Sequence, residues 1–188
     1  MKVLHQGLLA AATLVFAIGN VSAKVYNALP EESVISYHMV HKMHEFTGVS
    51  KKFRCAVDLP EDTLKARIYV KAGIVEFNSG NSSRDGNMLE VTEAAKYPYV
   101  EFASDSVRKG GMDDKGQQLW RVFGRLSFHG VKKPVNFLVR PLIGGGKVRI
   151  EGIFDISLTE FKIERPSLLM IPVDDALQIR ISVVANGP

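Results

Sequence analysis

Residues 147 to 158 read KVRIEGIFDISL, and from Val148 onward every second residue is apolar or glycine. Val148, Ile150 and Phe154 share one face of an extended chain, and Lys147 and Arg149 share the other. Successive side chains of a β-strand point to opposite faces, so this pattern predicts a strand with one buried face and one wet face. The pattern also favours an antiparallel sheet, because parallel strands covered on both faces read as continuous apolar runs.

Further segments carry the same alternation or a looser form of it, and glycine-rich turns such as Gly144–Gly146 separate neighbours. These segments are residues 34–40, 52–58, 64–72, 99–107, 120–128, 134–140 and 177–185. With residues 147–158 they make eight strands, the number at which a closed barrel can hold its own side chains plus one small ligand. The sequence therefore predicts an all-β domain built as an eight-stranded antiparallel barrel.

Residues 81–98 interrupt the alternation. Ser82, Ser83, Asp85 and Asn87 are potential helix caps, and Pro98 ends the segment. Asn87 also precedes a glutamate at the spacing of a capping box. We expect one short helix here, which crosses the sheet or closes one end of the barrel.

The first 23 residues have the layout of a secretory signal peptide. Lys2 precedes an apolar run from Leu8 to Ile18, and small residues end at Ala23. The apolar run is too short to span a bilayer. We expect cleavage after Ala23 and a mature single domain, residues 24–188, in the periplasm or outside the cell.

Charge and cysteine content argue against two classes of function. The formal net charge is +4, and the basic residues are scattered rather than interleaved with aromatic residues, so we expect no nucleic-acid partner. Cys55, the only cysteine, falls in an alternating segment beside Phe53 and Val57, which favours an inert core thiol over a nucleophile. The chain also lacks a Gly-x-Ser-x-Gly motif and a phosphate-binding glycine loop. We therefore expect a protein that is not an enzyme.

The inward faces of the expected strands indicate a ligand cavity. Ala66, Gly124, Gly152 and Ala185 are small residues among large apolar ones. Either they leave room for a ligand, or neighbouring aromatic side chains fill the gaps and make a solid core. In the hollow alternative, the expected lining consists of Leu64, Ile68, Val122, Leu126, Phe128, Phe154, Ile179 and Ile181.

Several motifs occur in a fixed order along the chain. GNSSRDGNMLE at 80–90 precedes KYPYVEFAS at 96–104, VFGRLSFHGVKKPVNFLV spans 122–139, and FDISLTEFKIERPSLLMIPVDDALQIRISVVA spans 154–185. Together with His41 and Gly48, these motifs resemble the YceI-like proteins, secreted bacterial lipocalin-like barrels associated with binding polyisoprenoid lipids. The resemblance implies a lipocalin-like barrel that binds, and carries or stores, an isoprenoid, a quinone-like lipid or another long-chain lipid, with no other cofactor.

The chain departs from this resemblance near its C-terminal end. Many members read Arg-x-Asp-Phe-Gly after the penultimate strand, whereas this chain reads FKIERP at 161–166. The apolar stretch PSLLMIP, residues 166–172, is either a flap at the barrel mouth that makes transient membrane contact or a plug over one barrel end. An outward face that includes Lys65 and Tyr69 could support a homodimer or simply solvate the barrel.

Arg84 and Asp85 are the most polar part of the resemblance, and they have two interpretations. They could hold a ligand headgroup, such as a quinone carbonyl or a phosphate, at the mouth. Alternatively, Asp85 caps the helix and Arg84 pairs across the barrel end. His41 is a third polar candidate near the mouth.

Three histidines, His38, His41 and His44, are spaced three residues apart. If they lie on a strand, His38 and His41 point to opposite faces and cannot share a metal directly. We therefore expect no metal site, and His41 to end its strand and hydrogen-bond locally. A periplasmic metal-binding protein that uses the three histidines stays open as an alternative, as does a structural or stress-protection module with a solid core.

Overall fold

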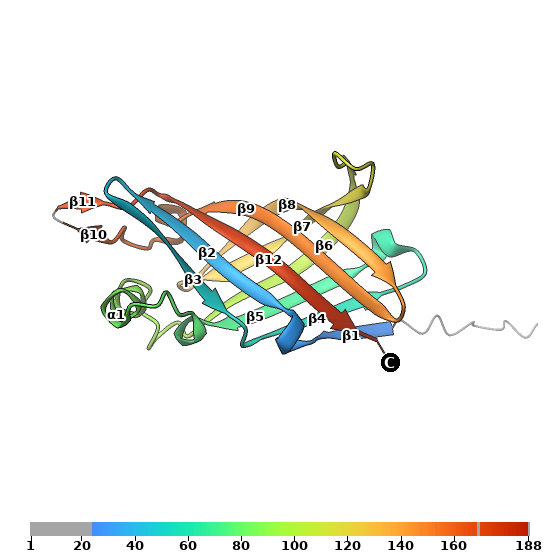
Figure 1. The fold of residues 1–188 in the computed structure, drawn as a ribbon, viewed down its shortest axis with the longest axis horizontal. Helices are drawn as coiled ribbons and strands as arrows, with labels where there is room; N and C mark the ends of the chain where they lie inside the picture. Colours follow the sequence, from blue (N-terminus) through green and yellow to red (C-terminus); the bar gives the residue numbers. More distant parts are fainter. Residues whose placement is uncertain (1–23, 169, 188) are drawn as a thin grey trace, which may run out of the picture.

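The computed structural model describes residues 24–168 and 170–187, so the expected signal peptide lies outside the described residues. Within these ranges the chain forms strands, one α-helix and short 3₁₀ helices (Figure 1). The strands are β1 (Lys24–Ala28), β2 (Val34–His41), β3 (His44–Ser50), β4 (Phe53–Leu59), β5 (Arg67–Gly73), β6 (Tyr99–Met112), β7 (Gln118–Phe128), β8 (Val131–Gly144), β9 (Lys147–Ser157), β10 (Ser167–Leu168), β11 (Ile171–Pro172) and β12 (Ala176–Asn186). The helices are η1 (Pro30–Glu32), η2 (Thr63–Lys65), η3 (Ile74–Glu76), α1 (Ser82–Val91) and η4 (Thr159–Phe161).

Eight strands close into an antiparallel barrel in the order β1-β4-β5-β6-β7-β8-β9-β12. β12 pairs with β9 along its whole length. The ring closes where the end of β12 pairs with β1, at Asn27 with Asn186 and Ala28 with Ala185. The eight-stranded antiparallel barrel predicted from the alternation is therefore confirmed.

The sheet also contains two strands that the alternation does not predict, β1 in the ring and β3 beside β2. β1 is short and mostly exposed, and β3 has no run of alternating apolar residues, so neither carries a period-two signal. β2 pairs with residues 178–182 of β12 and with β3, which adds a hairpin beside the ring at one end. In Figure 1 this hairpin runs along the end of the barrel that also holds α1 and the small β10–β11 hairpin.

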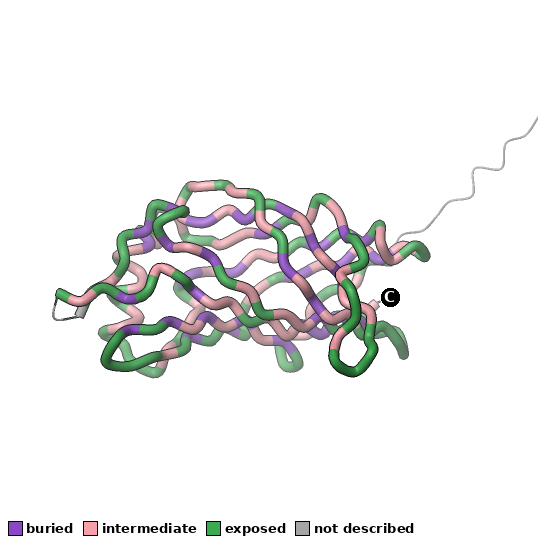
Figure 2. The backbone as a smooth tube through the Cα atoms, turned by 90° about the horizontal axis from the view of Figure 1, so that it is seen from above, coloured by how far each residue is buried: buried purple, intermediate pink, exposed green. Residues whose placement is uncertain are grey.

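The alternation places the core where the sequence predicts it. Figure 2 shows buried positions alternating with intermediate or exposed ones along the strands. In β9, for example, Val148 and Ile150 are buried, and Lys147 and Arg149 are exposed. Cys55 lies in the same core, and burial raises the pKa of its thiol to about 12, so it stays protonated at neutral pH.

The small inward residues do not produce the cavity. A Cβ added to Gly124 would lie 2.6 Å from Phe102 Cε2, and one added to Gly152 would lie 3.0 Å from Val139 Cγ1. Ala66 and Ala185 are each only 1% exposed. Neighbouring atoms therefore fill the space beside the two glycines, as in the solid-core alternative, and neither alanine borders a cavity.

The expected helix forms as α1, and its cap is a residue that the sequence analysis passes over. The Asn81 side chain accepts a hydrogen bond from the Arg84 backbone N–H at 3.0 Å. All side chains of α1 are at least partly exposed. Among the described residues, no helix is long and apolar enough to cross a membrane.

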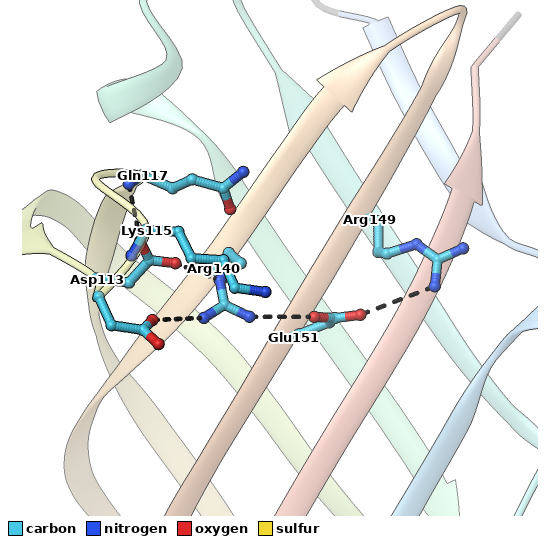
Figure 3. A network of polar contacts seen from close by, with 7 residues as sticks. Asp113, Lys115, Gln117, Arg140, Arg149 and Glu151 are labelled. Carbon is cyan, nitrogen blue, oxygen red and sulfur yellow. Dashed lines mark hydrogen bonds and ion pairs between the residues drawn. The ribbon is translucent and has the colours of Figure 1, made fainter.

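A polar network fastens the β6–β7 turn to the outside of the barrel (Figure 3). One oxygen of Asp113 accepts hydrogen bonds from the backbone N–H groups of Lys115 and Gln117 at 2.9 and 2.8 Å. Its other oxygen accepts from Arg140 Nε at 2.7 Å, and Arg140 Nη1 lies 3.6 Å from Glu151. The pKa of Asp113 is lowered, chiefly by the Gln117 N–H and then by Arg140.

Candidate ligand-binding cavity

An apolar cavity of about 170 Å³ occupies the half of the barrel nearest α1. Its walls come from the inward faces of β2, β5, β6, β7, β8, β9 and β12. α1 forms part of its cover through Met88 and Val91, and the exposed Asn87 marks where the cavity reaches solvent. The barrel end that carries the helix is therefore also the end that carries the cavity.

The opposite half of the barrel is solid. Val57, Trp120, Val122, Val139 and Val148 are each at most 3% exposed, and they do not border the cavity. The barrel therefore combines the two alternatives that the sequence leaves open, with a hollow half and a packed half.

A group of phenylalanines marks the boundary between the two halves. Phe137 stacks on Phe154 with ring centroids 4.1 Å apart and an interplanar angle of 9°, and Phe102 lies 5.2 Å from Phe137. All three border the cavity. Val122, the cross-strand partner of Phe137, is fully buried and does not border it, so the cavity ends at this layer.

The structure places the expected lining residues in two groups. Five of them surround the cavity together, namely Leu126, Phe128, Phe154, Ile179 and Ile181. Ile68 and Val122 lie in the packed core away from the cavity. Leu64 is not on a strand, because Asp62 caps the short helix η2 and β5 begins only at Arg67.

Other lining residues come from elements that the sequence analysis does not use for the site. Ile35, Tyr37 and Met39 point inward from β2, and Met88 and Val91 cover the cavity from α1. The period of two in residues 34–41 carries the signal for the first three. The helix residues carry no such signal, because their role depends on where α1 docks.

Among the described residues that border this cavity, Arg84 is the charged one. Its guanidinium carbon lies 4.4 Å from the centre of the Phe46 ring, and its Nε is buried without a hydrogen-bond partner among the described residues. A buried donor without a partner is unfavourable, and an acceptor on a ligand would relieve that cost.

Tyr37 adds a second polar group near Arg84. The Tyr37 ring packs 5.7 Å from Phe77 and 6.4 Å from Phe46, between ring centroids. Burial raises the pKa of the Tyr37 hydroxyl to about 12, the Asp85 carboxylate adds to the rise and Arg84 opposes it. The hydroxyl therefore stays protonated at neutral pH and can donate a hydrogen bond.

Asp85 has a structural partner of its own. Its two carboxylate oxygens accept from the Ser79 backbone N–H at 3.0 and 3.3 Å. This contact holds the segment that leads into α1. The structure thus separates the two residues, since Asp85 orders the backbone while Arg84 borders the cavity.

His41 joins the β2–β3 hairpin to the β10–β11 hairpin and does not border the cavity. Its Nδ1 accepts from the Met43 backbone N–H at 3.2 Å, and its Nε2 lies 2.9 Å from the Ile171 carbonyl oxygen. These two bonds fit one tautomer, in which Nε2 carries the proton and donates. β2 does end at His41, and the side chain hydrogen-bonds, although one partner is far along the chain.

The other two histidines of the cluster do not join His41 in a ligand set. His38 lies on the outer face of β2, where its Nδ1 is 3.1 Å from Thr47 Oγ1 and its Nε2 is 3.4 Å from Glu45. The ring of His44 is exposed and lies 5.3 Å from that of His41. Within the described ranges, no group of three or more His, Cys, Asp or Glu side chains is placed to hold a metal ion.

The size of the cavity limits what it can hold as it stands. A cavity of roughly 150 Å³ in another protein accommodates benzene, and this one measures about 170 Å³. One compact apolar group therefore fits without change. A longer chain must spread the lining or extend past α1 into solvent.

The YceI-like domain model matches residues 26–185, a range that begins within β1, ends within β12 and contains the six other strands of the ring. The chain belongs to the YceI-like family. This YceI-like chain is 29% identical over 146 residues to a UPF0312 protein of Pseudomonas fluorescens, with 74% of this chain and 73% of that protein covered.

Solved structures share the YceI-like fold at low sequence identity. BcnA of Burkholderia cenocepacia superposes with a TM-score of 0.74 at 20% identity, and the match covers 85% of this chain and 99% of BcnA. A polyisoprenoid-binding domain from Saccharophagus degradans, implicated in plant cell wall breakdown, gives a TM-score of 0.68 at 14% identity, with 87% and 98% covered. At these identities the likeness shows the fold alone.

Proposed function

We propose that this YceI-like protein binds an isoprenoid or another long-chain apolar lipid in the cavity beside α1, without catalysing a reaction on it. The observation that carries the proposal is an apolar cavity at one end of a barrel whose other end is solid. A polyisoprenoid-binding domain among the structural relatives supports the same ligand class.

The binding energy would come from the chain of the ligand. Each buried methylene contributes about 0.8 kcal/mol, so a few isoprene units supply several kcal/mol before the costs of ordering the chain. Such a site selects for apolar length and girth. Because the cavity ends at the phenylalanine layer, the ligand would enter and leave past α1, and the remainder of a long chain would lie at that mouth.

Arg84 and Tyr37 would bind a polar end of the ligand. The Arg84 Nε–H, which has no partner within the described part of the chain, and the protonated Tyr37 hydroxyl can both donate. The favoured group is therefore an acceptor such as a carbonyl, a carboxylate or a phosphate. Asp85 would contribute indirectly, by fixing the backbone before α1.

The proposed setting is the periplasm or the exterior, after removal of residues 1–23. There a carrier or a storage protein would shield an apolar chain from water. The apolar walls of the cavity would provide that shielding without any catalytic group.

Thermal unfolding of the mature protein with farnesol, geranylgeraniol or palmitate tests the proposal. A ligand that binds only the folded state at about a hundredfold excess over its Kd should raise the melting temperature by roughly 5 °C or more. Absence of a rise with all three compounds, in a protein shown to be free of endogenous lipid, would remove this function.

A further inference from the structure

Three phenylalanines are the deepest residues that border the cavity on their strands. They are Phe102 on β6, Phe137 on β8 and Phe154 on β9. Two residues further toward the packed half, none of the three strands borders the cavity any longer; the residues there are Ser104, Val139 and Gly152. The three rings therefore form a floor under this side of the cavity.

The rings of the floor pack against one another. Phe137 stacks on Phe154 with centroids 4.1 Å apart, and Phe102 lies 5.2 Å from Phe137 at an angle of 52°. Stacked and tilted contacts between aromatic rings add to the stability that comes from their burial. A ring that swung aside would lose these contacts, so we expect the floor to keep its position when a ligand enters.

A glycine beside the floor gives the Phe102 ring its place. Phe102 pairs across the sheet with Leu126 of β7, which borders the cavity, and Gly124 lies two residues further toward the packed half. A Cβ at Gly124 would lie 2.6 Å from both Cε2 and Cζ of Phe102. The ring therefore occupies the space that a side chain at this position would need, and no void is left below it.

From this arrangement we propose that the floor of Phe102, Phe137 and Phe154 sets the length of apolar chain up to which affinity increases. This inference rests on the proposed function and specifies its ligand. A methylene group contributes to binding only where it leaves water, so a chain that has reached the floor gains little from further units that stay at the mouth. Because the cavity measures about 170 Å³, affinity should level off at roughly one to two isoprene units.

Isothermal titration of the mature protein with geraniol, farnesol and geranylgeraniol tests this limit. Each alcohol is longer than the one before it by one isoprene unit, and all three carry the same hydroxyl end. The Kd values of the wild type for farnesol and geranylgeraniol should lie within about threefold of the Kd for geraniol.

Phe154→Ala should move the limit to a longer chain. The Phe154 side chain is only partly buried, and the next inward residue on β9, Gly152, has no side chain to take its place. The ring that is removed is similar in size to one isoprene unit, so this variant should bind farnesol about tenfold or more tighter than geraniol. Phe137→Leu, a milder change to the same floor, should shift the preference in the same direction by a smaller factor.

Phe123→Ala is the matched control. Phe123 lies on β7 beneath the guanidinium of Arg108, 5.0 Å from its ring centre, and does not border the cavity. The substitution removes a ring of the same size without changing the floor. It should keep the wild-type ratio of the farnesol and geraniol Kd values, and thermal unfolding followed by circular dichroism checks that each variant folds.

Three results would overturn this inference and leave the proposed function in place. One is a wild-type affinity that rises about tenfold or more with each added isoprene unit. Another is an unchanged farnesol-to-geraniol ratio in both floor variants. The third is a shift in Phe123→Ala as large as that in Phe154→Ala. Failure of the wild type to bind any of the three alcohols would instead remove both the chain-length limit and the proposed function.

Discussion

Arg84 illustrates how one residue can serve two purposes at the cavity mouth. Its backbone N–H completes the cap on α1, while its side chain crosses to the Phe46 ring and borders the cavity. The neighbouring Asp85 points instead to the backbone of Ser79. The sequence indicates both residues as a pair, but only the three-dimensional arrangement shows which of the two borders the cavity.

An Arg84→Met substitution should weaken binding of a ligand with a charged end and spare an uncharged one. Methionine keeps an apolar stem beside Phe46 but removes every donor, and a hydrogen bond to a charged group contributes about 1.5–3 kcal/mol. We therefore expect the Kd for farnesyl phosphate to rise about tenfold or more, and the Kd for the hydrocarbon farnesane to change little.

Arg108→Met is the matched control for this comparison. Arg108 also lies over a phenylalanine, with its guanidinium carbon 5.0 Å from the Phe123 ring centre, but neither residue borders the cavity. Isothermal titration of both variants distinguishes the two sites. Equal effects of the two substitutions would show that Arg84 has no special role toward the ligand.

Two buried alanines should respond differently to the same enlargement. Ala72 borders the cavity and is 4% exposed, whereas Ala66 lies in the packed half and is 1% exposed. Ala72→Phe should fill empty space, leave the free energy of unfolding nearly unchanged and abolish farnesol binding. Ala66→Phe should overpack the core and cost about 1–3 kcal/mol.

Urea denaturation and farnesol titration of these two variants provide the measurement. If Ala72→Phe destabilises the protein as much as Ala66→Phe does, the cavity near Ala72 is not available space. Retained farnesol binding in a stable Ala72→Phe variant would place the ligand elsewhere.

Among the elements, α1 should depend most on what fills the cavity, because two of its apolar side chains line it. It has ten residues, and isolated helices of fewer than about 12–15 residues are marginal in water, so its stability comes from packing. Its apolar contacts, Met88 and Val91, face the cavity. A bound chain would give these side chains a partner that the empty cavity does not provide.

Hydrogen exchange should therefore report ligand binding at α1. With farnesol bound, the amides of residues 82–91 should exchange more slowly, while those of β7 around Trp120 and Val122 should change much less. Mass spectrometry of exchanged peptides measures both regions in one experiment. Uniform slowing across the chain, with no added effect at α1, would contradict the location of the site.

The β6–β7 turn should respond to acid. The pKa of Asp113 is lowered in the folded protein, first by the Gln117 N–H and then by Arg140, so its carboxylate stabilises the fold above the ordinary aspartate pKa. That stabilisation is lost as the pH falls from about 4 through the lowered value. Stability should therefore fall on acidification, and Asp113→Asn should remove part of this dependence.

Chemical denaturation at a series of pH values from neutral to about 3 measures this effect. Asp114→Asn is the control, because the Asp114 side chain is 82% exposed and lies 4.0 Å from Arg140. The same pH profile for both variants would show that the network in Figure 3 does not govern acid sensitivity.

For the whole molecule, the alternation predicts the barrel better than it predicts the cavity. A period of two in segments such as 147–158 determines which side chains face inward, and the structure keeps that assignment. The pattern cannot tell how far along the barrel axis a residue lies. Ile68 and Ile179 both face inward, but only Ile179 is at the hollow end.

The empty and filled parts of the barrel and the strands without an apolar pattern could not be predicted, because they depend on contacts in three dimensions. Small inward residues such as Gly124 suggest free space, yet the Phe102 ring covers that position. Two strands missing from the sequence prediction, β1 and β3, carry no apolar pattern of their own. β1 is held by pairing with the distant strands β4 and β12, and β3 is held by the hairpin that it forms with β2. Contacts between distant segments decide where the barrel closes and where it stays empty.

The central claim is that the cavity beside α1 holds an apolar lipid, and mass spectrometry tests it most directly. The mature protein, purified without detergent, is measured intact under native conditions, and an organic extract is measured before and after denaturation. The account predicts one isoprenoid or other long-chain lipid per protein, released only on denaturation and absent from the Ala72→Phe variant. Protein without a bound lipid, even after incubation with membrane lipids, would contradict it.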